Sequence, residues 1–254
     1  MMPGEQTVKA TVEPAADSGE LHLKKTVFLA YTDVTAAASR ALLGINMRKE
    51  YYSLEVPEIA NYKPACVRDA APEPTEQNFQ SIQVLNCKYE QDAEEFSVVV
   101  VNTHLPGDKC HYVARKIMNL CIEGKVEKMI LLTSLHVDIE HNPDHAMLEN
   151  TFNTSPVTSH PPIPGHTKIC DPFLSTMIQM IQIEGMACNC LITPGYRVTS
   201  GKANTEDGTH QMICLFQHTL EELTNLRFDR QLSLDMLYRD SPDNEDDMVS
   251  LMYV

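Results

Sequence analysis

The spacing of apolar and polar residues along the chain predicts strands and helices in alternation. Residues 21–31, LHLKKTVFLAY, contain closely spaced apolar side chains, as is typical of a strand. The next segment, TDVTAAASRALLGI, is typical of a helix, with Thr32 or Asp33 as its N-cap and Gly44 at its end. We therefore expect the ordered part of the chain to begin with a strand followed by a helix.

Two further strand-like runs lie at residues 80–89 and 95–104, after a polar, proline-rich stretch that we expect to be a loop. Only a short acidic link separates the runs, which predicts an antiparallel pair. The second run contains an unbroken series of valines at positions 98–101. Because a strand without polar alternation is buried on both faces, this strand is expected inside the sheet.

The middle of the chain predicts a helix that leads into a buried strand. The helix begins after Pro106 and Gly107 and ends at Gly124, with an apolar stripe that includes Val113 and Ile117. A strong strand is expected at residues 129–133. The segment that follows, residues 138–168, is rich in proline and histidine and reads as irregular, either a functional loop or a disordered insertion.

The clearest single unit is a helix with both of its ends marked. Asp171 is expected as the N-cap, Pro172 as the first helical residue and Gly185 as the stop, before a strand at residues 186–192. Together with the strand at residues 129–133, this unit predicts a right-handed βαβ arrangement. A closing helical region is expected at residues 212–238, with an imperfect apolar face at Leu215, His218, Leu220, Leu223 and Leu226.

This order of elements predicts a single α/β domain, a mixed sheet with flanking helices. The domain is expected to span residues 21–240, between a flexible N-terminal leader at residues 1–20 and an acidic C-terminal tail at residues 241–254. The leader is rich in alanine, glutamate and proline, and the tail in acids. Such compositions bury too little apolar surface to fold alone.

Charge and composition narrow the classes of function. The chain has 35 acidic and 20 basic residues and a formal charge of −15, which disfavours nucleic-acid and anionic-membrane partners. We find neither a signal peptide nor an apolar run long enough to span a bilayer. The chain is therefore expected in the cytoplasm or nucleus, with its eight cysteines reduced.

Candidate chemistry is sparse, and no catalytic residue, cofactor or metal is expected. His136, His141 and His145 fall close together, but a proline separates the last two, and no cysteine lies near enough to complete a zinc site. Phosphate-binding glycine motifs and a nucleophile elbow are missing from the sequence. The glycine-containing loop at residues 199–208 follows a strand, so a small-molecule enzyme resembling nucleoside phosphorylases remains the alternative.

The last residues of the chain are the best candidates for a binding site. An acidic stretch runs into a hydrophobic ending that includes Met252, Tyr253 and Val254. The ending is either a short strand returning to a sheet edge or a ligand for another protein. We favour the ligand, because capture of a terminal carboxylate beside an aromatic side chain is a recurring mode of recognition.

Met252-Tyr253-Val254 resembles the C-terminal hydrophobic-Tyr-X motif of proteasome activators and assembly chaperones. The order of MILLTSLHV, the helix-and-strand segment that begins ICDPFL, and THQMICLFQHTLEEL is also similar to the proteasome assembly chaperone family over residues 126–254. The resemblance implies a non-catalytic protein that forms a heterodimer with a second, related assembly chaperone. It also implies binding to proteasome α-subunits and prevention of off-pathway α-ring dimers. The His/Pro-rich insertion and the strongly acidic run before the ending depart from the family pattern.

Overall fold

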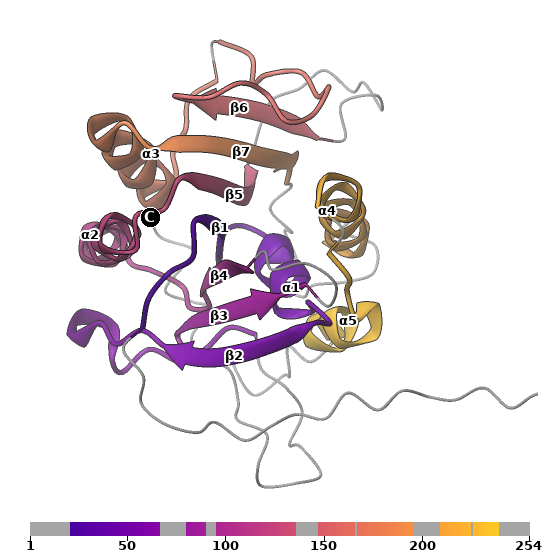
Figure 1. Ribbon diagram of the computed structural model, residues 1–254, viewed down its shortest axis with the longest axis horizontal. Helices are drawn as coiled ribbons and strands as arrows, with labels where there is room; N and C mark the ends of the chain where they lie inside the picture. Colours follow the sequence, from indigo (N-terminus) through magenta and orange to yellow (C-terminus); the bar gives the residue numbers. More distant parts are fainter. Residues whose placement is uncertain are drawn as a thin grey trace, which may run out of the picture.

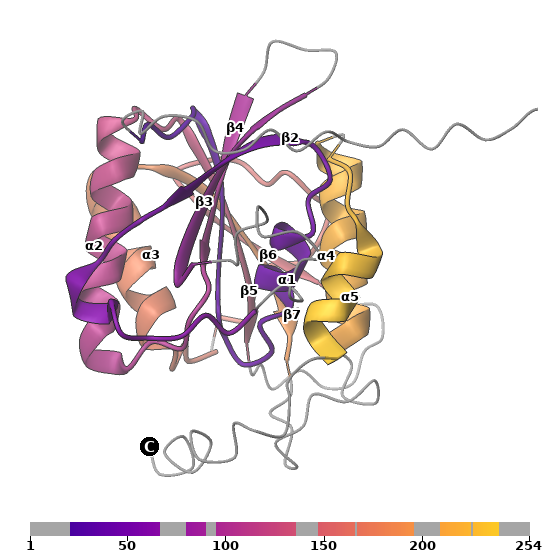
Figure 2. The ribbon, with the colours of Figure 1, turned by 90° about the horizontal axis from the view of Figure 1, so that it is seen from below.

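A computed structural model of the chain describes residues 21–66, 80–89, 95–135, 147–165, 167–195, 209–224 and 226–238. These residues form three layers, with a seven-stranded mixed sheet between two layers of helices (Figures 1 and 2). The expected α/β class, with one mixed sheet and flanking helices, is confirmed. The expected leader at residues 1–20 and tail at residues 241–254 lie outside the described residues.

Four parallel strands form the centre of the sheet, in the spatial order β4, β1, β5 and β7. They span Glu95–Val101, Thr26–Tyr31, Lys128–Leu135 and Ala187–Pro194. The valines at positions 98–101 are fully buried, which confirms that β4 is covered on both faces. Such continuous apolar runs suit parallel strands, because helices cover both sides of the sheet.

Antiparallel strands close both ends of the sheet. On one side β3 (Ile82–Lys88) pairs with β4 as expected, and β2 (Arg48–Ser53) pairs with β3 at the edge. On the other side β6 (Leu148–Phe152) pairs with β7. Neither edge strand was expected from the sequence.

The strand β6 corrects the expectation that residues 138–168 are irregular throughout. Its sequence, LENTF, lacks a strand pattern because its polar side chains organise the loop that follows. The Glu149 carboxylate accepts the backbone N–H groups of Val157 and Thr158, at 2.8 Å each, and the side-chain amide of Asn189 on β7, also at 2.8 Å. A buried carboxylate thus binds the loop to the sheet edge.

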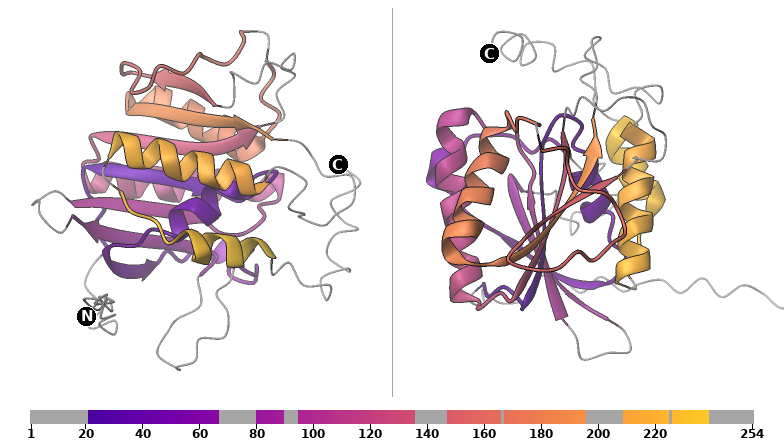
Figure 3. Two further views of the ribbon diagram at one scale, coloured as in Figure 1. Left: turned by 90° about the vertical axis from the view of Figure 1, so that its right-hand side faces the viewer. Right: turned by 90° about the horizontal axis from the view of Figure 1, so that it is seen from above.

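The helices divide between the two faces of the sheet, as Figure 3 shows from the side and from above. On one face lie α2 (Gly107–Glu123) and α3 (Pro172–Glu184), which pack against each other. On the other lie α1 (Ala37–Leu43), α4 (Thr209–Leu223) and α5 (Arg230–Tyr238). Each face of the sheet has its own apolar core. A 3-10 turn, Pro57–Ile59, follows β2.

Local signals at the helix ends were read correctly for α3. The Asp171 carboxylate accepts the backbone N–H of Leu174 at 2.7 Å, and Gly185 ends the helix with φ of 65°. A left-handed backbone conformation at this position favours glycine, because glycine has no Cβ atom. The strands β5 and β7 on either side of α3 are parallel neighbours, as a βαβ unit requires.

Two expectations about helix faces and caps were wrong. The N-cap of α1 is Ala36, with Asp33 three residues earlier accepting its backbone N–H at 2.8 Å. The predicted apolar face of α4 included His218, but the side chain of this residue is 63% exposed. The residues that bury α4 against the sheet are Met212, Ile213, Phe216 and Leu220. Within the described residues, no helix is both long enough and apolar enough to cross a bilayer.

Candidate functional site

The residues predicted as the partner-binding anchor are not among those the structure describes. Met252, Tyr253 and Val254 come after residue 238, where the description of the chain ends at α5. The loop at residues 199–208 and the group of His136, His141 and His145 also lie outside the described residues. These remain predictions from the sequence.

Within the described residues, polar side chains gather at the carboxyl edge of the parallel strands. Asp33 follows β1, Thr103 follows β4, Ser134 lies near the end of β5 and Thr193 near the end of β7, and all four are buried. The chain leaves β1 for a helix on one face of the sheet and leaves β4 for a helix on the other. In α/β proteins, ligand sites are found at the carboxyl edge beside such a reversal.

The centre of this polar cluster is the Asp33 carboxylate. One of its oxygens, Oδ1, accepts the backbone N–H groups of Thr35 at 3.0 Å and Ala36 at 2.8 Å. The other, Oδ2, accepts the backbone N–H of Ser134 and lies 3.2 Å from Oγ1 of Thr133. The carboxylate therefore joins the turn after β1 to the neighbouring strand β5.

A series of hydroxyl groups extends the cluster toward β7. The Thr35 hydroxyl donates to Oγ of Ser134 at 2.9 Å, and Oγ of Ser134 lies 3.0 Å from Oγ1 of Thr193. On the other side of the carboxylate, Oγ1 of Thr133 donates to the Tyr31 hydroxyl at 2.8 Å. The cluster thus links β1, β5 and β7 through side chains, in addition to the backbone ladder.

Burial changes the acid–base properties of this cluster. It raises the pKa of Asp33 from 3.8 to about 6, although the backbone N–H groups of Ser134, Thr35 and Ala36 act in the opposite direction. The pKa of Tyr31 lies well above its ordinary value, first because of burial and then because of the charges of Asp171 and Asp33. A negative charge at Asp33 is therefore costly and depends on the surrounding donors.

The geometry fits a structural role for Asp33 better than a catalytic one. Only 6% of the residue is exposed, and both carboxylate oxygens accept hydrogen bonds from this chain's own backbone. A general base must reach the proton of a substrate. The sequence analysis did not predict this cluster. The feature that could have indicated it is the polar residue at the end of each apolar strand.

Several buried cysteine side chains have pKa values shifted away from those of nucleophiles. Burial raises the pKa of Cys87, Cys121 and Cys188 to about 12 and that of Cys110 to about 11. Reactive cysteines have the opposite shift, toward the thiolate. His210 and Cys214, four residues apart on α4, are both only partly buried. The described residues contain no group of three or more histidine, cysteine or acidic side chains able to hold a metal ion.

Comparisons by sequence find no relative. No protein-family model matches the chain. No curated protein matches it either.

Comparison of the fold with solved structures gives clear likenesses. A protein of unknown function from Thermoplasma acidophilum matches with a TM-score of 0.59 and 9% identity, over 91% of this chain and 88% of that one. PbaA of Pyrococcus furiosus, an archaeal homologue of a proteasome-assembly chaperone, matches at 0.56 and 11% identity, over 91% and 87%. PbaB of the same organism, an archaeal proteasome activator, matches at 0.54 and 11% identity, over 92% and 96%. The described part of the chain therefore shares the fold of these proteins.

Proposed function

We propose that this chain is a non-catalytic chaperone of proteasome core-particle assembly. It acts in the cytoplasm or nucleus as a heterodimer with a second, related assembly chaperone. It binds α-subunits through the C-terminal Met252-Tyr253-Val254 sequence and prevents off-pathway α-ring dimers. The observation that carries the proposal is the likeness in fold to PbaA and PbaB, combined with this ending of the sequence.

The ending supplies the chemistry for binding. The carboxylate of Val254 can pair with a lysine or with backbone N–H groups of an α-subunit pocket, while the Tyr253 ring fills an apolar slot. Attachment to a folded body raises the effective concentration of such a short ligand. The formal charge of −15 also favours approach to a pocket with a basic mouth.

The carboxyl edge of the sheet supports a non-catalytic role. This is the place where an α/β enzyme would hold its substrate. Here the Asp33 carboxylate already accepts hydrogen bonds from Thr35, Ala36 and Ser134. A substrate would have to displace donors that hold the turn after β1 against β5.

The decisive experiment measures binding of the full chain to α-subunits before and after removal of residues 252–254. We expect the truncated chain to lose at least about tenfold in affinity, because anchor residues in a pocket dominate binding free energy. Its thermal unfolding should match that of the intact chain.

A matched pair of variants separates the two anchors. Adding one glycine after Val254 keeps every side chain but moves the carboxylate, whereas Met252→Leu keeps the carboxylate and an apolar side chain. The extension should weaken binding and Met252→Leu should preserve it. Equal α-subunit affinity for the intact and truncated chains would exclude the tail as the anchor.

A further inference from the structure

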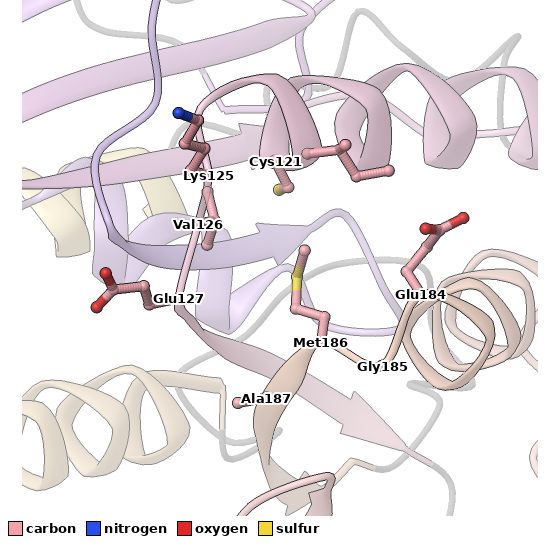
Figure 4. Close-up of a pocket in the computed structure, with 9 residues that line it drawn as sticks. Cys121, Lys125, Val126, Glu127, Glu184, Gly185, Met186 and Ala187 are labelled. Carbon is pink, nitrogen blue, oxygen red and sulfur yellow. The ribbon is translucent and has the colours of Figure 1, made fainter.

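The amino edge of the central strands, opposite the polar cluster, contains a pocket between the ends of α2 and α3. Its volume is about 360 Å³, and Cys121, Val126 and Met186 contribute apolar atoms to its lining. Figure 4 shows the Met186 side chain directed toward Cys121, with Lys125 on one side of the opening and Glu184 on the other. The pocket is therefore lined by polar and apolar atoms together and has opposite charges on its rim.

Two isoleucines extend the apolar surface from this pocket outward. Ile122, which lines the pocket from α2, is 48% exposed, and Ile183, next to Glu184 at the end of α3, is 80% exposed. Single exposed apolar residues are ordinary on protein surfaces. Here both lie at the ends of two helices that pack against each other, Ile122 in the lining of the pocket and Ile183 next to Glu184 of that lining.

The outer side of α3 has an unusual composition for a surface helix. From Pro172 to Ile183 the helix contains no charged residue. Its exposed positions include Gln179, Gln182 and Ile183, whereas Ile178 and Met180 are partly buried and pack against the core. Depletion of charge is typical of the centre of a protein–protein interface.

The outward side of α2 gives this surface a charged border. Arg115 and Lys116 are exposed, and neither forms an ion pair with another described side chain. Tyr112, one turn earlier, is 49% exposed. On a chain with a formal charge of −15, this basic pair defines the charge that a complementary surface must have.

The opposite layer offers a contrast. On α4 and α5, Arg230 forms an ion pair with Glu221 at 3.0 Å, and Nε2 of His218 lies 3.3 Å from the Glu222 carboxylate. These exposed polar groups therefore have partners within the chain. The outward side of α2 and α3 is therefore the better candidate for a partner.

We propose that the outer surface of α2 and α3 binds the second assembly chaperone, an inference that rests on the proposed function. The partner covers the exposed side chains of Ile122 and Ile183 with apolar side chains of its own. It places carboxylates opposite Arg115 and Lys116, and a basic group opposite Glu184. The uncharged side of α3 forms the dry centre of the contact.

The test uses the full chain co-expressed with the second assembly chaperone from the same source. Ile183→Asp places a charge at the centre of the contact without touching the core, because Ile183 is 80% exposed. Gln211→Asp places the same charge at an exposed position of α4 and is the matched control. We expect Ile183→Asp to weaken the heterodimer at least about tenfold and Gln211→Asp to leave it unchanged. Both variants should unfold at the temperature of the unmodified chain.

A second variant tests the charged border. Arg115→Glu should reduce the association rate and make the remaining binding less sensitive to salt, because it removes an attraction to partner carboxylates.

Equal heterodimer affinity for the unmodified chain and Ile183→Asp would overturn this surface and leave the proposed function standing. If the unmodified chain forms no heterodimer, both this inference and the heterodimer in the proposed function fail. Binding of α-subunits through the tail is measured separately.

Discussion

The carboxylate of Asp33 accepts the backbone N–H of Ser134, a residue 101 positions later in the chain. This contact joins the turn after β1 to the end of β5, at the edge where α/β enzymes bind substrates. In this protein the other carboxylate oxygen accepts the N–H groups of Thr35 and Ala36, just before α1. A residue with the position and raised pKa of a catalytic acid thus acts as a connection between strands.

Removal of this carboxylate should destabilise the fold. In Asp33→Ala the backbone N–H groups of Thr35, Ala36 and Ser134 lose their acceptor, and the Ser134 group is buried. We expect the free energy of unfolding to fall by about 3 kcal/mol, as measured by urea denaturation. Asp108→Ala, at an exposed carboxylate in the first turn of α2, is the control and should change stability by less than about 1 kcal/mol. Equal losses in the two variants would contradict the role of Asp33.

The same group should make stability depend on pH in a definite direction. The folded pKa of Asp33, about 6, lies above the value of 3.8 for an unperturbed carboxyl. The folded state therefore holds the proton more tightly than the unfolded state. The resulting stabilisation is complete below about pH 3.8 and is lost as the pH rises through 6. Its size is on the order of 3 kcal/mol, from the difference between these two values.

Asp33→Asn gives the measurement of this dependence, because the amide does not titrate. The difference in unfolding free energy between the unmodified chain and this variant should fall between pH 4 and pH 7, in about the window set by the two pKa values. Other carboxylates cancel in that difference. Glu95 is one of them, and hydrogen bonds from Lys24 and Lys88 lower its pKa to about 2. A difference that stays constant over this range would exclude titration of Asp33.

The contact between α1 and α5 should depend on a glycine. A Cβ added at Gly44 would lie 1.9 Å from Oγ of Ser233 and 3.1 Å from the backbone oxygen of Asp229. Gly44→Ala is therefore expected to cost about 2 kcal/mol, measured by thermal or urea unfolding. In the double variant with Ser233→Ala the total loss should be smaller than the sum of the two single losses. Additive losses would show that the two positions do not touch.

Small molecules should not stabilise the protein if its function is non-catalytic. A thermal-shift screen of the full chain with nucleosides and inorganic phosphate is expected to leave the midpoint unchanged, because a ligand stabilises only a state that it binds. A concentration-dependent rise in the midpoint would favour the small-molecule enzyme. That rise should then be lost when residues 199–208 are replaced by a glycine–serine loop.

Much of the architecture was readable from the sequence because its signals are local. Asp171 and Gly185 mark the ends of α3 through groups within a few residues of them. The continuous valines of β4 predict a strand that is buried on both faces. The fold class, the ends of α3 and most central strands can be predicted from such patterns. The proposed anchor also depends on a local feature, the last three residues of the sequence.

The tertiary structure alone decided what the polar residues do. Glu149 makes β6 an edge strand by accepting donors from a loop and from Asn189, 40 positions away. Asp33 becomes a connection only because β5 lies beside β1. The exposed side chains of Ile122 and Ile183 lie near one pocket because α2 and α3 end at the same edge of the sheet. Each of these results depends on partners distant in the chain, and the identity of such partners is fixed by the order of strands in the sheet and not by any local pattern.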